Sequence, residues 1–132
     1  MVGEAETRTA TDRAAGTRTI GRLWLDAVAQ NRSAPAYLVE RNGSWESVSW
    51  PDAARAVDEL AHGLLSLGIR KGDAFAIVAR TTLEWTSFDF ALALVGAITA
   101  PVYANNSPKD ARSWKTSSRI SNDQFQLLIG LI

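Results

Sequence analysis

The 132-residue chain contains no cysteine and one histidine, and its charges balance, with fourteen basic and fourteen acidic side chains. The absence of cysteine excludes a disulfide framework, thiolate metal sites and a cysteine nucleophile, and it fits a reducing compartment. Because His62 is the sole histidine, a histidine-rich metal site is excluded as well. A neutral chain also lacks the basic field that attracts nucleic acid, so we expect no nucleic-acid partner.

No stretch of the chain is long and apolar enough to be a transmembrane segment. The longest apolar run has fifteen residues, Phe90–Ala104, and Gly96, Thr99 and Pro101 interrupt it. A membrane anchor needs about 18 to 20 apolar residues. Residues 1–19 lack the apolar core of a signal peptide and include three acidic side chains, which argues against a transit peptide. We therefore expect 1–19 to be a disordered tail and the protein to be cytoplasmic.

The first half of the chain predicts two helices that flank a hairpin. Apolar residues at helical spacing predict a helix over 20–31, which Thr19 can cap. The pair Asn42-Gly43 between two alternating runs predicts a hairpin with a type I′ turn. A second amphipathic helix should begin after Ser49 and end at Gly68, which suits the left-handed conformation that follows many helices.

The second half of the chain predicts a strand–helix–strand unit of a parallel sheet. Residues 74–79 and 98–103 have the composition of buried strands. Between them, Thr81 and Glu84 have capping-box spacing, so a helix should start near residue 82 or 83 and stop at Gly96. That helix is apolar on all sides after Phe88, which predicts that it lies against the sheet and beneath other structure. A further helix start is expected at residues 107–108, and the apolar end of the chain can form another strand.

The search for a reactive site returns no candidate residues. The sequence contains neither a glycine-rich phosphate loop nor a serine elbow. Glu84 and Asp89 are five residues apart, so on a helix their carboxylates should diverge. His62 is expected to face solvent in an i,i+4 pair with Asp58. From the residues alone we predict an α/β domain with no catalytic, cofactor-binding or metal-binding residue.

Four stretches in order resemble the N-terminal start of the acyl-adenylate-forming enzymes (the AMP-dependent synthetase/ligase superfamily), and most closely the long-chain fatty-acid–CoA ligases. They are "ERNGSWESVSWPDAARAVDELAHGLLSLGIRKGD" (40–73), "AFAIVARTTLEW" (74–85), "FDFALALVGAITAPVY" (88–103) and "ANNSPKD" (104–110). The resemblance covers about residues 20–110. It implies the first portion of that family's large N-terminal domain, with a β-hairpin, a βαβ unit and flanking helices.

The resemblance also implies a reaction. In this family ATP and a fatty acid give an acyl-adenylate, coenzyme A then forms the thioester, and Mg²⁺ neutralises the phosphates. The family's Ser/Thr/Gly-rich loop ending in Pro-Lys-Gly, its aromatic-x-x-Thr-Glu motif, its ribose-binding aspartate and its C-terminal lysine have no counterpart in this sequence. No functional residue is therefore carried over, and we expect the chain to bind no cofactor and to be inactive alone.

Residues 111–132 depart from the family pattern, being rich in serine and basic residues and then abruptly apolar. One hypothesis is a shifted reading frame or premature stop after the last matching motif, which reading the downstream nucleotides in the other two frames would test. Three interpretations of the chain follow: a truncated fatty-acid–CoA ligase, a stand-alone binding or interaction module, and a non-functional product that folds poorly. Acyl-CoA formation measured alongside a pull-down for partners separates the first two, because a saturable specific partner would favour the module, and expression with size-exclusion chromatography identifies the third.

Overall fold

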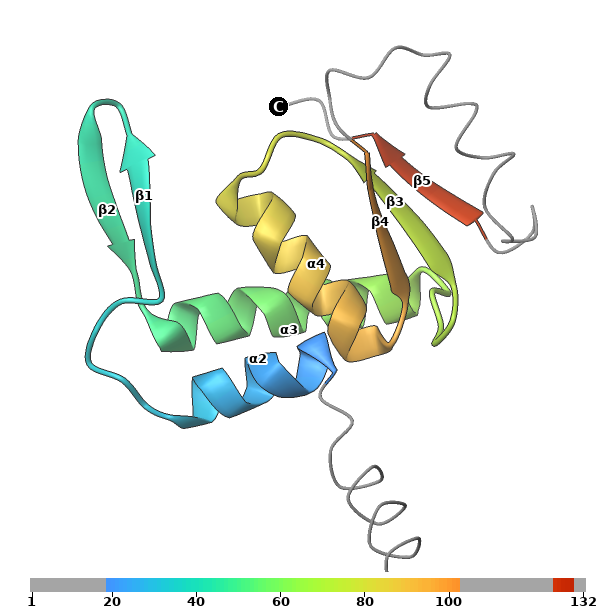
Figure 1. Ribbon diagram of the computed structural model, residues 1–132, viewed down its shortest axis with the longest axis horizontal. Coiled ribbons are helices and arrows are strands. Elements are labelled where there is room, and N and C mark those ends of the chain that lie inside the picture. Colours follow the sequence, from blue (N-terminus) through green and yellow to red (C-terminus); the bar gives the residue numbers. More distant parts are fainter. Residues whose placement is uncertain (1–18, 103–124, 130–132) are drawn as a thin grey trace, which may run out of the picture.

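The computed structural model describes residues 19–102 and, for the main chain, residues 125–129. Residues 1–18 of the expected tail over 1–19, and the expected helix start at residues 107–108, lie outside the described residues. Thr19 is described and caps the helix that begins at Ile20, as predicted. In chain order, the elements are α2 (Ile20–Ala29), β1 (Tyr37–Arg41), β2 (Ser44–Val48), α3 (Trp50–Ser66), β3 (Ala74–Val78), α4 (Leu83–Val95), β4 (Ile98–Val102) and β5 (Phe125–Ile129) (Figure 1). The fold class is α/β, as predicted.

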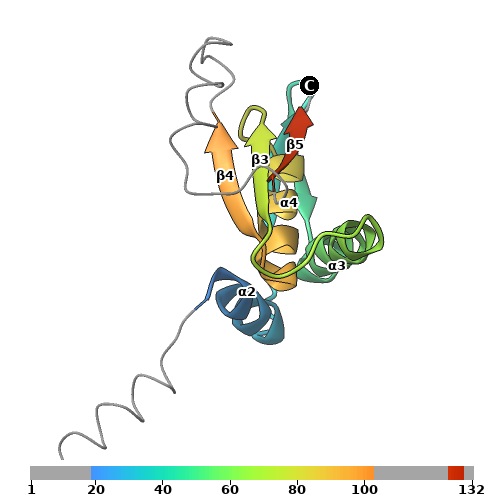
Figure 2. The same ribbon diagram turned by 90° about the vertical axis from the view of Figure 1, so that its right-hand side faces the viewer.

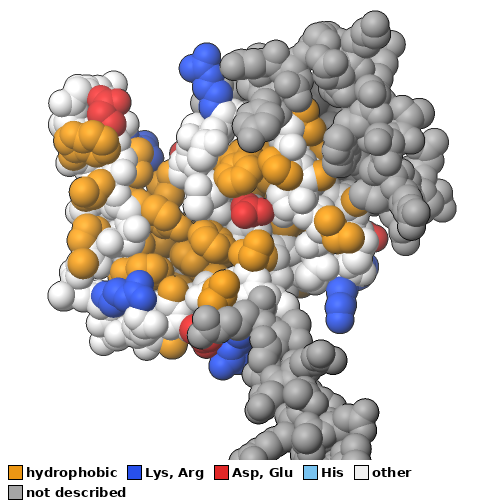
Figure 3. Space-filling view, in the orientation of Figure 1, with side chains coloured by type: hydrophobic (Ala, Val, Ile, Leu, Met, Phe, Trp, Pro, Cys, Tyr) orange, Lys and Arg blue, Asp and Glu red, His pale blue; other side chains and the backbone are white. Residues whose placement is uncertain are grey.

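The hairpin β1–β2 forms as its turn residues predict. Arg41 pairs with Ser44, which leaves Asn42 and Gly43 as the two-residue loop. Both have positive φ, 52° and 82°, as a type I′ turn requires. The hairpin stands to one side of α4 in Figure 1, and hydrophobic side chains cover much of the surface between the two in Figure 3.

Helix α3 begins and ends at the predicted residues. The Ser49 hydroxyl accepts the amide N–H of Asp52 at 3.2 Å, which makes it the N-cap. At the other end Gly68 adopts φ 93°, and the N–H of Ile69 donates to the carbonyl of Leu64 at 3.0 Å. Gly68 therefore ends the helix in the left-handed conformation that a side chain with a Cβ rarely adopts.

Helix α4 begins at Leu83, so its predicted start at residue 82 or 83 is confirmed. Its N-cap is Thr82, whose hydroxyl accepts the N–H of Trp85 at 3.2 Å. The capping-box spacing pointed to the adjacent Thr81 as the cap, and the structure uses Thr82 instead. Glu84 then lies at the second helical position, where its charge favours the positive end of the helix dipole. Gly96, at φ 83°, ends the helix as predicted.

The predicted βαβ unit is confirmed, with strands that end at Val78 and Val102. The three-stranded sheet has the order β4-β3-β5, and both neighbours run parallel to β3. The apolar end of the chain thus forms the strand that the sequence suggested. Figure 2 shows the three strands side by side with α4 against one face of the sheet.

The core surrounds α4. Its residues Ala91 and Leu92 are fully buried. Trp24 of α2 stacks on Phe90 with ring centroids 4.4 Å apart, and Phe75 of β3 lies 6.0 Å from Phe88. Helix α4 therefore joins the sheet to the other two helices, and its mainly apolar sequence follows from having neighbours on several sides.

Candidate functional site

A groove lies between α3 and α4, and we call it the α3–α4 groove. Its volume is about 630 Å³. Ten residues from α3, its C-cap and the N-terminal half of α4 line it: Ala56, Glu59, Leu60, Gly63, Leu64, Leu67, Leu83, Glu84, Ser87 and Phe88. Concave apolar surfaces of this size are where proteins bind ligands or partners.

The polar groups of the α3–α4 groove are engaged in the helices that carry them. The Ser87 hydroxyl donates to the carbonyl of Leu83 at 2.9 Å. The pKa of Glu84 is lowered, because its own main-chain N–H and the Thr82 hydroxyl donate to the carboxylate. Glu84 is therefore held ionised as part of the α4 N-terminus. None of these groups is an activated base or nucleophile.

A second groove, of about 570 Å³, lies where α2, α4 and β4 meet. It is lined by Thr19, Ile20, Gly21, Lys71, Trp85, Asp89, Ala93, Gly96, Ala97, Thr99 and Pro101. Asp89 is its acidic residue, whereas Glu84 lines the α3–α4 groove. The predicted divergence of these two carboxylates is thus confirmed, and they cannot act as an acid–base pair.

His62 lies on the exposed side of α3, as expected, but its contact differs from the prediction. Its Nδ1 is 2.8 Å from the main-chain carbonyl oxygen of Asp58. The expected ion pair with the Asp58 carboxylate is absent from the ion pairs of the described residues. A helical side chain can hydrogen-bond to the main-chain carbonyl four residues earlier. His62 makes this local contact with the Asp58 carbonyl in place of an ion pair with the Asp58 carboxylate.

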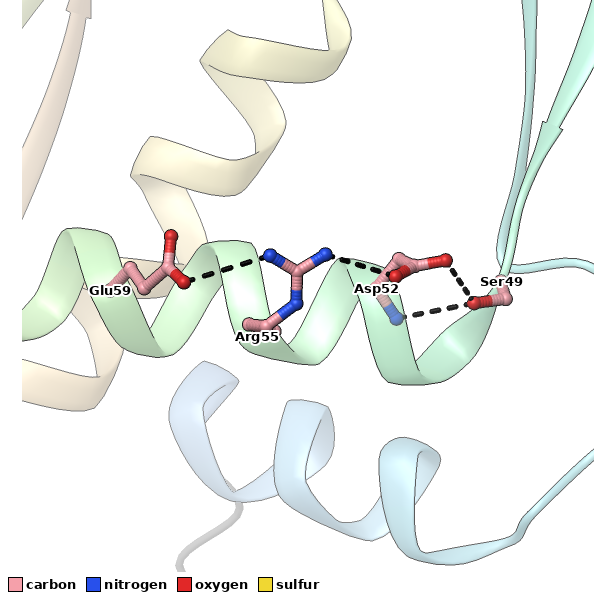
Figure 4. A network of polar contacts seen from close by, with 4 residues as sticks. All are labelled: Ser49, Asp52, Arg55 and Glu59. Atoms are coloured by element: carbon pink, nitrogen blue, oxygen red, sulfur yellow. Dashed lines mark hydrogen bonds and ion pairs between the residues drawn. The ribbon is translucent and has the colours of Figure 1, made fainter.

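The strongest electrostatic cluster belongs to the start of α3 (Figure 4). The Ser49 hydroxyl donates to Asp52 Oδ2 at 2.7 Å, and Arg55 Nη2 donates to Asp52 Oδ1 at 3.0 Å. These two donors lower the pKa of Asp52. Arg55 Nη1 also lies 3.7 Å from Glu59 Oε1. The pKa of Arg55 is raised, mainly by its hydrogen bond to Asp52 and then by the charge of Glu59. Since all four side chains are exposed, the cluster caps the helix and forms no enclosed site.

Two close contacts were not predictable from the sequence pattern. The guanidinium of Arg32 lies 5.1 Å from the ring centroid of Trp50, a cation–π contact. Gly21 lies so near α4 that an added Cβ would be 2.8 Å from the Ala93 carbonyl oxygen. The sequence around Arg32 or Gly21 does not indicate which residue each will contact, because both contacts join elements that are far apart in the sequence.

The described residues do not fit the cofactors that the family resemblance implies. Within residues 19–102, no three histidine, aspartate or glutamate side chains gather closely enough to hold a metal ion. In the same region no helix has the length and apolar character needed to cross a bilayer. No phosphate-binding loop is present anywhere in the 132-residue sequence. No catalytic step is derived from these residues.

Solved structures with the same fold define the class of protein. CmiS6 superimposes with a TM-score of 0.71 at 18% identity, over 84% of this chain and 26% of that one. The N-terminal domain of FACL13 from Mycobacterium tuberculosis gives 0.68 at 19% identity, over 86% of this chain and 27% of that one. The fatty acid AMP ligase from Legionella pneumophila superimposes with a TM-score of 0.68 at 13% identity, over 84% of this chain and 19% of that one. The fold is that of the N-terminal part of adenylate-forming enzymes.

Residues 24–121 match the family described as AMP-binding enzyme, and the chain belongs to that family. The resemblance inferred from the four motifs is thus confirmed. The match extends beyond residue 110, where the motifs end. The proposed boundaries at residues 19 and 110, and the reading-frame hypothesis for 111–132, stay predictions.

The curated relatives that match this chain include long-chain-fatty-acid–CoA ligases. The long-chain-fatty-acid–CoA ligase FadD15 of Mycobacterium tuberculosis is 37% identical over 84 residues, which are 61% of this chain and 14% of FadD15. Its counterpart in Mycobacterium bovis matches to the same extent. Protein Y of Streptomyces griseus is 35% identical over 95 residues, 72% of this chain and 30% of that protein. The chain thus spans less than a third of the length of these relatives.

Proposed function

We propose that this chain is the N-terminal scaffold portion of a fatty-acid–CoA ligase and that it is inactive alone. The parent reaction activates a fatty acid with ATP to an acyl-adenylate and then transfers the acyl group to coenzyme A. The observation that carries the proposal is the family match over residues 24–121, together with 37% identity to a long-chain ligase. This match favours the ligase interpretation over a stand-alone binding module.

The geometry supports the scaffold role. The two large grooves hold carboxylates that lie apart from one another, and the polar groups around the α3–α4 groove belong to helix caps and helix backbones. Acyl transfer needs donors aimed at the developing oxyanion and a positive charge near the phosphates. No lysine or arginine lines the α3–α4 groove, and the sequence has no counterpart of the family's loop and lysine motifs.

The cofactors and partners of the proposed activity follow from the parent reaction and belong to the whole enzyme. They are ATP, Mg²⁺, coenzyme A and a fatty acid. The same proposal places the protein in lipid metabolism and in the cytoplasm, which the lack of cysteine favours.

A chimera tests the proposal. In Mycobacterium tuberculosis FadD15, the segment matched by this chain is replaced with the corresponding residues of this chain, and acyl-CoA formation is measured with ATP, Mg²⁺, coenzyme A and a long-chain fatty acid. We expect the chimera to turn over and the isolated 132-residue chain to give none. A matched chimera carrying Val57→Asp, which puts a charge in a side chain that is 1% exposed, should lose the activity together with the fold.

Two results would contradict the proposal. A chimera that folds, as judged by its thermal transition, and yet forms no acyl-CoA would show that this chain is no ligase scaffold. Turnover by the purified isolated chain would show that the assignment of inactivity is wrong.

A further inference from the structure

The α3–α4 groove exposes apolar side chains that a folded domain normally covers. Leu67, at the C-cap of α3, has 82% of its surface exposed. Leu60 and Leu83 line the same groove, with Phe88 at its α4 wall. Single exposed apolar residues are common, but a concave apolar surface marks a contact with another element or molecule.

Gly63 supplies a second, independent sign that the groove receives something. A glycine inside a helix costs about 1 kcal/mol relative to alanine. At most such positions a close neighbour explains the glycine, but no atom lies within 4 Å of where a Cβ of Gly63 would stand. No contact within the described part of the chain therefore explains why residue 63 lacks a side chain. A segment packed into the groove, against the main chain of α3, would explain the glycine.

The charges around the groove restrict what can enter it. Its charged lining residues are Glu59 and Glu84, and no lysine or arginine lines it. Glu84 is held ionised by the helix start. A fatty-acid carboxylate would be repelled by this rim. Glu59 is already paired with Arg55, and the groove lining offers no basic side chain to complement the Glu84 carboxylate of a second copy, which disfavours a symmetric dimer through this surface.

The coverage of the relatives indicates a different occupant. The chain matches 14% of FadD15 and at most 30% of the other relatives described above. Most of the enzyme fold of these relatives therefore lies outside the matched segments. It is the candidate for covering the apolar side chains that the α3–α4 groove leaves exposed.

We propose that the α3–α4 groove is the docking surface for the part of an AMP-binding enzyme that this chain does not contain, and that this docking occurs even when the two parts are separate polypeptides. The docked segment presents apolar side chains to Leu60, Leu67 and Phe88, approaches the main chain of α3 at Gly63, and places no carboxylate opposite Glu59. The proposal rests on the proposed function.

The lack of cysteine allows a direct test of whether the groove becomes covered. Leu67→Cys introduces the sole thiol at the groove, and His62→Cys introduces it on the exposed side of α3, outside the groove. Each variant is co-expressed with tagged FadD15 from which the matched segment has been deleted, and maleimide labelling of the captured chain is followed by mass spectrometry. We expect labelling at position 67 to slow by about tenfold or more in the complex, and labelling at position 62 to stay within about twofold.

A second pair of variants tests the role of the open glycine. Gly63→Leu fills the groove with four carbon atoms while improving helix propensity, so the chain should fold and capture should be lost. Ser66→Leu adds the same side chain to an exposed α3 position outside the groove, and capture should persist. The thermal transition of each purified variant verifies that it is folded.

Several outcomes would overturn the proposal. These are the absence of capture of the folded wild-type chain, undiminished capture of Gly63→Leu, and unchanged labelling of Leu67→Cys in the complex. Protection of Leu67→Cys in the isolated chain with rising concentration would assign the groove to a second copy instead. The FadD15 chimera described above reports on the proposed function separately, since a chimera can be active without docking in trans, and docking can occur without activity.

Discussion

The closest approach between α2 and α4 provides a quantitative test of the packing. At Gly21 an added Cβ would lie 2.8 Å from the carbonyl oxygen of Ala93 and 3.2 Å from its carbonyl carbon. Both atoms belong to the main chain of α4, so no flexible side chain can move aside. We predict that Gly21→Ala destabilises the chain, even though alanine is the better helix former.

The size of the effect follows from two opposing contributions. Alanine in a helix gains about 1 kcal/mol over glycine. Forcing an additional methyl group into a closely packed contact costs about 1 to 3 kcal/mol. Separating α2 from α4 would also weaken the stacking of Trp24 on Phe90, a contact worth about 0.5 to 1.5 kcal/mol. We expect a net loss of roughly 1 to 2 kcal/mol in the free energy of unfolding.

Gly63→Ala is the matched control, because it makes the same chemical change in a helix where no atom lies within 4 Å of the new Cβ. It should stabilise the chain by up to about 1 kcal/mol. Urea unfolding followed by the fluorescence of the five tryptophans measures both variants. If Gly21→Ala is as stable as the wild type, α2 and α4 do not pack at the distance described here, and the reasoning fails.

Three further predictions concern the start of α3 and the core. Ser49→Ala should lower the free energy of unfolding by about 1 kcal/mol in urea titrations, because the Asp52 N–H loses its capping acceptor. Asp52→Asn should be less stable than the wild type at pH 7. That difference should vanish as the pH falls through the lowered pKa of Asp52, since the stabilisation exists only above the unfolded value and is lost on protonation. A constant difference from pH 7 to pH 2 would exclude this ion pair as its source. Leu92→Ala, at a fully buried position, should cost about 2 to 5 kcal/mol in thermal or urea unfolding, and a cost below about 1 kcal/mol would contradict the central place of α4.

The elements that sequence reasoning predicted correctly are those with local signals. The type I′ turn depends on Asn42 and Gly43 alone, and the end of α3 depends on Gly68, because positive φ strongly favours these residue types. The start of α4 at residue 82 or 83 was also predicted correctly, but its N-cap was not, since Thr81 and Thr82 are chemically the same cap and only the packed helix decides between them. Local chemistry predicts that a helix begins, while tertiary contacts set the residue at which it begins.

The contacts between elements could not be read from the sequence. The Arg32–Trp50 contact and the Gly21–Ala93 approach depend on how helices and loops meet in space. The contact of His62 with the Asp58 carbonyl was missed for another reason. The i,i+4 rule considers pairs of side chains, and it leaves out the main-chain oxygen that lies at the same spacing. The α3–α4 groove had no sequence signal as a cavity, since its residues are ordinary apolar positions of two amphipathic patterns.

The charge-free stretch of α4 and β4 connects the sequence to the proposed role. A run of fifteen uncharged, mainly apolar residues first raises the question of a membrane segment. Its described part, residues 90–102, folds as half a helix, a turn at Gly96 and a strand. Such a run is stable in a soluble protein when both the helix and the strand have neighbours on more than one side. Here β3 and α2 supply some of these neighbours, while Leu67 and Phe88 border an open groove. The docking experiment tests whether an additional layer covers this groove.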